Sequence, residues 1–164
     1  MATQVTAIYP GSFDPVTNGH LDIVNRSREK FDRIIVAVLV NLEKKPLFTT
    51  EKRVAMLREV TGQWNNVAVD TFEGLLVNYA KANDAHVILR AIRAVTDYEY
   101  EFQMALMNRR MEPKIETVFM VPAEEYSYLS SRLVKEIFLL GGSVSGLVPP
   151  VVEDFLKEKT GSEG

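Results

Sequence analysis

The sequence predicts an α/β fold in which helices flank a single doubly wound parallel sheet. Short apolar runs rich in β-branched residues alternate with helical patterns along the whole chain, which is typical of such sheets. The runs are apolar throughout, as expected of strands that are buried on both faces. With 164 residues and a hydrophobic fraction of 46%, the chain is long enough for one core and short for two. We therefore expect a single domain.

Five segments are predicted as strands and six as helices. The strand segments are apolar and largely β-branched, and they are residues 5–9, 34–40, 67–71, 87–89 and 117–121. Helical patterns cover about residues 19–31, 50–62, 74–83, 96–111 and 131–140, and a last helix follows Pro149 and Pro150. Gly141 and Gly142 are expected to end the fifth helix. The expected domain spans residues 1–159, and a polar tail covers 160–164.

Charge and composition exclude several classes of function. The net charge of −3 provides no overall positive field for nucleic acid or an anionic membrane. The chain has no cysteine and two histidines, so thiol chemistry is excluded and a metal site built by the protein is not expected. No apolar run reaches the roughly 18 residues of a membrane span, and residues 1–9 lack a targeting pattern. We expect a soluble cytoplasmic protein.

Groups that bind anions follow four of the five predicted strands, where parallel sheets bind ligands. After the first strand, a loop rich in glycine and proline precedes a helix that begins near Asn18, and its backbone N–H groups can hold phosphate. The other groups are Lys44 and Lys45 after the second strand, Arg90 and Arg93 at the fourth, and Ser130, Ser131 and Arg132 after the fifth. Together they predict a locally positive edge suited to a phosphate-rich ligand.

Each of these signals is weak alone. A histidine or a serine at a helix start is often a cap, and paired lysines or arginines are often a solvated surface. Walker and dinucleotide-binding glycine motifs are absent, which disfavours kinases and dehydrogenases. His86, at the entry to the fourth strand, is interpreted as structural. Asp14, in Phe-Asp-Pro, is interpreted as a residue that closes a turn through its own side chain.

The helix predicted at 96–111 carries more apolar surface than one stripe requires. Tyr98, Phe102 and Ala105 form one stripe, and Tyr100, Met104, Met107 and Met111 form another. Either one stripe faces a second subunit, or both pack inside the same chain. The sequence favours neither alternative.

The segment Tyr9-Pro10-Gly11-Ser12-Phe13-Asp14-Pro15, followed by Thr17-Asn18-Gly19-His20, resembles the T/HxGH signature of the nucleotidyltransferase superfamily. With Lys44-Lys45-Pro46, residues 89–101 and residues 126–136, the chain resembles the bacterial phosphopantetheine adenylyltransferase family over about residues 5–157. The resemblance implies a Rossmann-like fold of the nucleotidyltransferase type. It also implies transfer of AMP from ATP to 4′-phosphopantetheine, giving dephospho-coenzyme A and pyrophosphate in coenzyme A synthesis. Mg²⁺ is expected through the ATP phosphates, members are typically cytoplasmic homohexamers, and coenzyme A is a candidate feedback inhibitor.

The resemblance also assigns roles to residues. Catalysis falls to His20, Lys44 and Arg93, with His20 as donor to the α-phosphate during a direct in-line attack. Acceptor binding falls to Ser12, Lys44, Leu76 and Arg90. The residues implied for ATP are Ser12, Phe13, His20, Ala91, Ile92, Arg93, Glu101, Tyr126, Ser127, Tyr128, Leu129, Ser130, Ser131 and Arg132.

The chain departs from the family pattern at four places. Family members generally have Gly where this chain has Ala91, often Trp at Tyr126, frequently Ser or Thr at Arg132, and Pro-Ser at Leu42-Glu43. None of these differences removes a charged group. Ala91 matters only if its backbone needs a positive φ or a very close approach to ATP.

Three other functions share features with this sequence. The T/HxGH loop alone also fits a sibling transferase that acts on nicotinamide mononucleotide or on a sugar or glycerol phosphate. A nucleotide sensor without catalysis would keep the fold, although intact His20, Lys44 and Arg90 argue against it. A class I tRNA synthetase shares the fold type, but this chain has no room for a tRNA-binding domain.

Overall fold

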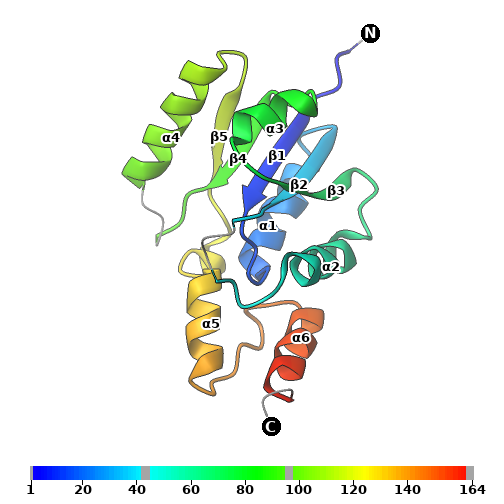
Figure 1. Ribbon diagram of the computed structural model, residues 1–164, viewed down its shortest axis with the longest axis vertical. Helices are drawn as coiled ribbons and strands as arrows, with labels where there is room; N and C mark the ends of the chain where they lie inside the picture. The colour runs from blue at the N-terminus through cyan, green and yellow to red at the C-terminus, as the bar shows by residue number, and fades with distance from the viewer. Residues whose placement is uncertain (1, 42–44, 95–97, 162–164) are drawn as a thin grey trace.

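The structure, a computed structural model, describes residues 2–41, 45–94 and 98–161. Five strands form one fully parallel sheet in the order β3-β2-β1-β4-β5 (Figure 1). Their bounds are Thr6–Gly11 for β1, Arg33–Leu39 for β2, Val67–Phe72 for β3, Val87–Ala91 for β4 and Glu116–Met120 for β5. The predicted doubly wound sheet is confirmed. Each strand lies within two residues of its predicted bounds.

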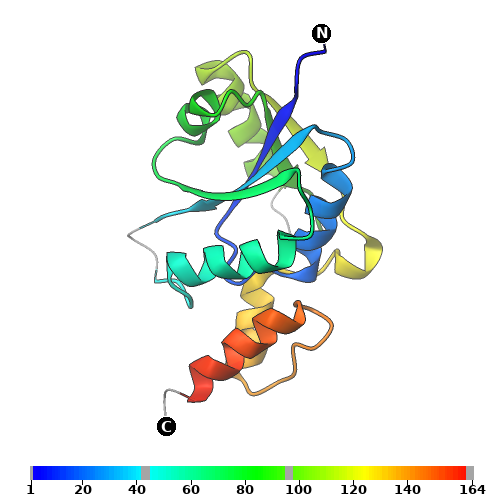
Figure 2. The same ribbon diagram turned by 90° about the vertical axis from the view of Figure 1, so that its right-hand side faces the viewer.

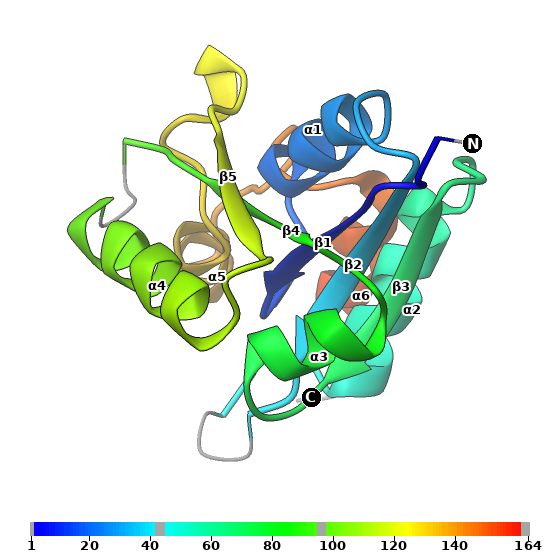
Figure 3. The same ribbon diagram turned by 90° about the horizontal axis from the view of Figure 1, so that it is seen from above.

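Six α-helices accompany the sheet in the described part of the chain. They are α1 (Asn18–Ser27), α2 (Thr50–Thr61), α3 (Leu76–Ala82), α4 (Tyr98–Met111), α5 (Ser131–Leu139) and α6 (Pro150–Gly161), and a short 3₁₀ turn, η1, covers Glu124–Tyr126. Helices α1 and α2 cover one face of the sheet, and α3 and α4 cover the other (Figure 3). Helices α5 and α6 lie beyond the carboxyl ends of the strands (Figures 1 and 2).

Three helix boundaries differ from the sequence prediction by two residues or more. One is the start of α3, which begins at Leu76 and not at residue 74. Helix α1 ends four residues early, because the N–H groups of Lys30 and Phe31 donate to the Ser27 carbonyl in a turn. Helix α6 continues to Gly161, two residues into the segment expected as a polar tail. The first two residues of the predicted fourth helix, 96 and 97, lie outside the described residues.

The central strand β1 is buried on both faces. Ala7 and Tyr9 point into a core shared with α1, α2 and α6, and Ile8 points into a smaller core under α3. Side chains alternate across a strand, so a strand covered on both faces needs apolar residues at every position. This explains why the run contains no polar alternation. Burial of a side chain of the size of Ile8 contributes about 1.5–3 kcal/mol.

The strand order creates one switch point. From β1 the chain proceeds to β2 and β3 on one side, and it then returns to place β4 against the other side of β1. In doubly wound sheets the crevice outside the carboxyl ends at such a point binds ligands. Ser12 follows β1 here, and Arg90 lies near the end of β4.

Helix α4 packs on the fold through polar residues and exposes apolar ones. Glu101 and Asn108 are its buried residues, whereas Tyr98, Tyr100 and Phe102 are 54%, 56% and 47% exposed. The alternative that both apolar stripes pack inside the chain is therefore wrong. The buried side of the helix is polar because Glu101 pairs with Arg90. No described helix is long and apolar enough to cross a membrane.

Candidate active site

The loop of residues 12–17 between β1 and α1, named here the Ser12 loop, is anchored by Phe13. Phe13 has φ +48°, which is uncommon for a residue with a side chain. Its ring is buried and contacts the rings of Tyr9 and His20, with centroids 5.4 and 4.9 Å away. A Cβ on Gly11 would lie 3.1 Å from this ring, so glycine makes room for it. The ring thus fixes the backbone turn next to His20.

His20 is held in place by the start of α1. Thr17 is the N-cap, and its Oγ1 accepts the His20 N–H at 3.3 Å. In return, the Thr17 N–H donates to Nδ1 of the His20 ring at 3.0 Å. Because Nδ1 acts as an acceptor, a neutral ring carries its proton on Nε2. His20 therefore combines a capping role with an Nε2–H that can donate to a ligand.

The surroundings of His20 favour the neutral ring. Removal of the ring from water, followed by the charges of Arg93 and Arg90, lowers the pKa of His20 to about 3. At neutral pH the side chain is thus an uncharged hydrogen-bond donor. A group with so low a pKa cannot accept and release a proton efficiently near pH 7. The geometry favours donation over acid–base catalysis.

Asp14 has a structural role, as interpreted from the sequence, but through distant partners. Its carboxylate accepts the N–H groups of Leu47 and Phe48 at 2.8 and 2.9 Å. Lys135 of α5 lies 3.3 Å from the same carboxylate. The aspartate therefore ties the Ser12 loop to the segment before α2 and to α5, rather than closing a turn of its own.

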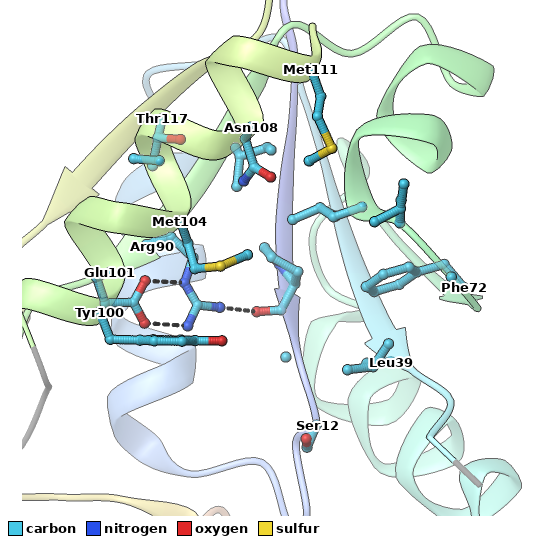
Figure 4. Close-up of a pocket in the computed structure, with 17 residues that line it drawn as sticks. Ser12, Leu39, Phe72, Arg90, Tyr100, Glu101, Met104, Asn108, Met111 and Thr117 are labelled. Atoms are coloured by element: carbon cyan, nitrogen blue, oxygen red, sulfur yellow. Dashed lines mark hydrogen bonds and ion pairs between the residues drawn. The ribbon is translucent and has the colours of Figure 1, made fainter. Parts of the chain in front are cut away.

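Arg90 is oriented by a two-point ion pair. Its Nε donates to Oε2 of Glu101 at 2.8 Å, and its Nη2 donates to Oε1 at 2.5 Å. Its Nη1 donates to the Pro10 carbonyl at 3.2 Å. Burial opposes the charge of Arg90, but the hydrogen bonds and charge of Glu101 outweigh it and raise the pKa. The guanidinium is a fixed cation beside β1 (Figure 4).

Direct contacts join the remaining motifs. Nη1 of Arg93 donates to the Leu129 carbonyl at 2.7 Å, and Oγ of Ser131 donates to the Pro15 carbonyl at 2.7 Å. Oγ of Ser130 caps α5 by accepting the Leu133 N–H. The capping role considered for Ser130 is thus confirmed. The structure brings together motifs that are more than 100 residues apart in the sequence.

Two cavities meet at the switch point. One, the polar cavity, has a volume of about 310 Å³ and contains His20, Arg93 and Arg132 in its wall. The other, the apolar cavity, has a volume of about 440 Å³ and lies between α3 and α4. In Figure 4, Met104 and Asn108 of α4 face Leu39 and Phe72 across it. The walls of both cavities share Pro10, Gly11, Ser12, Arg90 and Glu101.

Most of the predicted site residues line these cavities. In the polar cavity these are Ser12, Phe13, His20, Ala91, Arg93, Glu101, Ser130, Ser131 and Arg132, and in the apolar cavity Ser12, Leu76 and Arg90. Five residues implied for ATP do not line the polar cavity, namely Ile92, Tyr126, Ser127, Tyr128 and Leu129. Lys44 lies outside the described residues, as does the Leu42-Glu43 departure.

Two of the four departures can be located at the polar cavity. Ala91 ends β4 and is not among the described residues with positive φ. Alanine is therefore compatible with this backbone, and Ala91 lines the polar cavity. Arg132 lies in the first turn of α5 and adds a cation to the same wall.

Sequence reasoning missed most of the apolar cavity. Its further lining residues include Leu39, Phe72, Tyr100, Met104, Asn108 and Met111. In the sequence, Tyr100, Met104 and Met111 stand out only as an apolar stripe. A stripe of this kind shows that a face is apolar, but not whether it meets a ligand, a subunit or the core. Asn108, a polar residue four positions after Met104 on this face, was the available signal in the sequence, and the structure shows it to be buried.

Comparison with known proteins decides the family. The model of the cytidylyltransferase-like family matches residues 8–137. A phosphopantetheine adenylyltransferase from Carboxydothermus hydrogenoformans is 54% identical over 158 residues, covering 96% of this chain and 98% of that protein. This chain belongs to the phosphopantetheine adenylyltransferase family. A second family member, from Caldanaerobacter subterraneus, is 54% identical over 153 residues, covering 93% of this chain and 96% of that protein.

The fold extends beyond the phosphopantetheine adenylyltransferase family. A lipopolysaccharide core biosynthesis protein from Thermoplasma volcanium has a TM-score of 0.57 and 17% sequence identity to this chain. The match covers 74% of this chain and 100% of that one. At this identity the likeness concerns the fold alone.

Proposed function

We infer that this protein is an adenylyltransferase that transfers AMP from ATP to 4′-phosphopantetheine, releasing pyrophosphate and forming dephospho-coenzyme A. The observation that carries the inference is the pair of cavities that meet at Ser12 and Arg90. A bisubstrate transfer needs two ligands whose reacting atoms touch. The relatives of this chain carry the name of this activity.

The two cavities differ in chemistry as the two substrates do. The polar cavity offers His20, Arg93 and Arg132 near three serines, which suits a nucleoside triphosphate. The apolar cavity has the thioethers of Met104 and Met111 in its wall, which suits the pantetheine arm. Arg90 lines both cavities and is proposed to hold the acceptor phosphate, and Lys44 is expected to assist it.

The proposed reaction is direct. An oxygen of the acceptor phosphate attacks the α-phosphorus of ATP, the bond to the β-phosphate oxygen breaks, and pyrophosphate leaves with the bonding electrons. The acceptor phosphate is already an anion near pH 7, so no general base is needed. The difficulty lies in bringing two anions together and stabilising charge on the α-phosphate. Arg90 and Arg93 offset the repulsion between the two anions, and the Nε2–H of His20 stabilises the charge on the α-phosphate.

Mg²⁺ is proposed to arrive with ATP and to remain bound to its phosphate oxygens. Glu101 is the acidic residue in the wall of the polar cavity, and its carboxylate is paired with Arg90. The described residues offer no cluster of three acidic or histidine side chains for an ion. The donor set therefore suits a cation held by the phosphates of the substrate, and it would neutralise charge on them.

The test is an acceptor panel. Purified protein, ATP and Mg²⁺ are mixed with 4′-phosphopantetheine, nicotinamide mononucleotide or glycerol 3-phosphate, and pyrophosphate release is followed. We expect turnover with 4′-phosphopantetheine and at least roughly 100-fold lower kcat/KM with the others, since they cannot fill the apolar cavity. A preference for another acceptor would establish a sibling transferase. ATP binding without turnover of any acceptor would establish a nucleotide sensor.

We also propose that the protein self-associates through α4, with a homohexamer as the expected assembly. Helix α4 exposes Tyr98, Phe102, Leu106 and Met107, which is an unusual amount of apolar surface for one helix. Light scattering that gives a monomer would contradict this. A cytoplasmic location and feedback inhibition by coenzyme A remain proposals from the family resemblance. Fractionation of cells tests the first, and coenzyme A added to the pyrophosphate assay tests the second.

A further inference from the structure

Arg53 is a buried cation that none of the predicted motifs includes. It lies in the first turn of α2, where the helix dipole disfavours positive charge, and only 4% of it is exposed. No carboxylate among the described residues forms an ion pair with it. A buried charge without a counter-charge is costly. The stability of α2 therefore does not explain this arginine.

The partners of Arg53 lie at the carboxyl edge of the sheet. Its Nη1 donates to the Ser12 carbonyl at 2.8 Å and lies 3.5 Å from the Leu39 carbonyl. Its Nη2 donates to Oγ1 of Thr50 at 3.1 Å, and its buried Nε has no partner in the described structure. Ser12 follows β1 and Leu39 ends β2. The guanidinium thus connects both strand ends to α2, and one of its partners, Ser12, lines both cavities.

The bond to Ser12 fixes the direction of the next N–H group. Among the described residues the only cis peptide is Asp14–Pro15, so the Ser12–Phe13 peptide is trans. In a planar trans peptide the C=O and N–H bonds point in opposite directions. Because the Ser12 carbonyl points at Arg53, the Phe13 N–H points away from it. Within the described chain this N–H has no backbone acceptor, and Phe13 lines the polar cavity.

The backbone conformation of Phe13 has to be stabilised by neighbouring groups. A φ of +48° costs energy in a residue with a side chain, and it persists only where the surroundings impose it. The ring contacts hold Phe13 from one side. Arg53 holds the preceding peptide from the other. Without the guanidinium, the peptide could rotate and turn its carbonyl oxygen toward the phosphates.

We propose that Arg53 is a positioning residue for adenylyl transfer: it orients the Ser12–Phe13 peptide so that the Phe13 N–H donates to a phosphate of the nucleotide beside His20. The effect on turnover rests on the proposed function. The effect on phosphate affinity needs only the polar cavity to bind anions. These two effects can therefore be measured separately.

The competing role for Arg53 is purely structural: it would stabilise the fold and have no effect on phosphate binding. Arg53→Met distinguishes the two roles, because methionine keeps an unbranched apolar stem but removes the donors and the charge. Removal of a buried charge that has no counter-charge relieves its desolvation cost, and this relief offsets part of the cost of losing its hydrogen bonds. Arg53→Lys keeps the charge but loses the planar fork that donates to the Ser12 carbonyl and to Thr50 at the same time. Arg58→Met, at an exposed position of the same helix, is the matched control.

The experiment measures three quantities for each variant: melting temperature, kcat, and affinity for pyrophosphate by titration calorimetry. For Arg53→Met we expect a melting temperature near that of the wild type, a kcat about 100-fold lower, and pyrophosphate affinity about 10-fold weaker. Arg53→Lys should lose roughly 10-fold in kcat. Arg58→Met should match the wild type in all three.

Each outcome decides between the two roles. Wild-type kcat and pyrophosphate affinity in folded Arg53→Met would overturn the proposal, as would losses that merely follow the fraction of unfolded protein. If Arg53→Met does not fold, Arg53→Lys decides, and wild-type values there overturn the proposal. Wild-type protein that binds pyrophosphate but turns over no acceptor would refute the proposed function alone. Absence of pyrophosphate binding in the wild type would refute the positioning role.

Discussion

Replacing His20 with asparagine separates the two hydrogen bonds made by its ring. The Oδ1 atom of asparagine can take the place of Nδ1 and accept the Thr17 N–H, so the cap of α1 is kept. The Nε2–H and the titrating ring are lost. The variant should therefore fold as the wild type does near pH 7, while its stability should respond to acid in a different way.

The size of this difference follows from the pKa of His20. It is about 3 in the folded protein and about 6.5 in an unfolded chain. Between these values the unfolded chain binds one more proton, so stability falls as the pH falls. From pH 7 to pH 5 the wild type should lose about 2 kcal/mol through His20, at about 1.4 kcal/mol per pH unit below 6.5. His20→Asn should lack this loss.

The change in the free energy of unfolding with pH is measured by urea titration. Unfolding is followed by the fluorescence of Trp64, the single tryptophan. Wild type, His20→Asn and His86→Asn are compared at pH 7 and pH 5 at one protein concentration. His86 is the other histidine, with 54% of its side chain exposed, and its variant should follow the wild type. An equal pH dependence in wild type and His20→Asn would refute the claim that the fold keeps His20 neutral.

The remaining predictions concern rates and local stability. His20→Asn should lower kcat by about 10²–10³-fold and leave ATP affinity within about threefold, because a donor to the transition state is removed; a pure loss of ATP affinity would contradict that role. The pH profile of kcat/KM should show an acidic limb near pH 6 from the acceptor phosphate, and the same limb in His20→Asn, whereas its disappearance would make His20 a general base. Glu101→Gln should raise the acceptor KM by roughly 10-fold and the ATP KM less, because Arg90 loses its fixed orientation; equal changes in initial-rate measurements would argue against that placement. Ser130→Ala should lower the free energy of unfolding by about 1 kcal/mol in urea titrations, because α5 loses its cap, and an unchanged value would show that the cap does not matter.

The sheet could be predicted from the sequence because its strands are buried on both faces. A run such as 34–40 is apolar at each position, and such a run, short and rich in β-branched residues, is typical of a strand in the middle of a parallel sheet. The ends of the helices were harder to predict from the sequence, because they depend on single hydrogen bonds. The stop of α1 at Ser27 comes from a carbonyl shared by two N–H groups of the following turn, which no pattern in the sequence indicates.

The candidate site also has one part that the sequence predicts and another that it does not. The anion-binding groups could be predicted, because they follow the strands and parallel strands end at one edge. The apolar cavity could not, because Leu39, Phe72 and Met104 come from three distant segments. Arg53 also escaped prediction. In the sequence it is one cation on an amphipathic helix, and only its burial beneath the Ser12 carbonyl sets it apart.

The central claim is that acceptor and ATP occupy adjoining cavities and react directly across Ser12 and Arg90. The most direct test uses one diastereomer of adenosine 5′-[α-thio]triphosphate with isotopic oxygen at the α-phosphorus, with the configuration of the product read by ³¹P NMR. A single in-line attack by the acceptor phosphate predicts inversion at the α-phosphorus. Retention would mean two successive displacements through an adenylylated side chain, and it would contradict direct transfer between the two cavities.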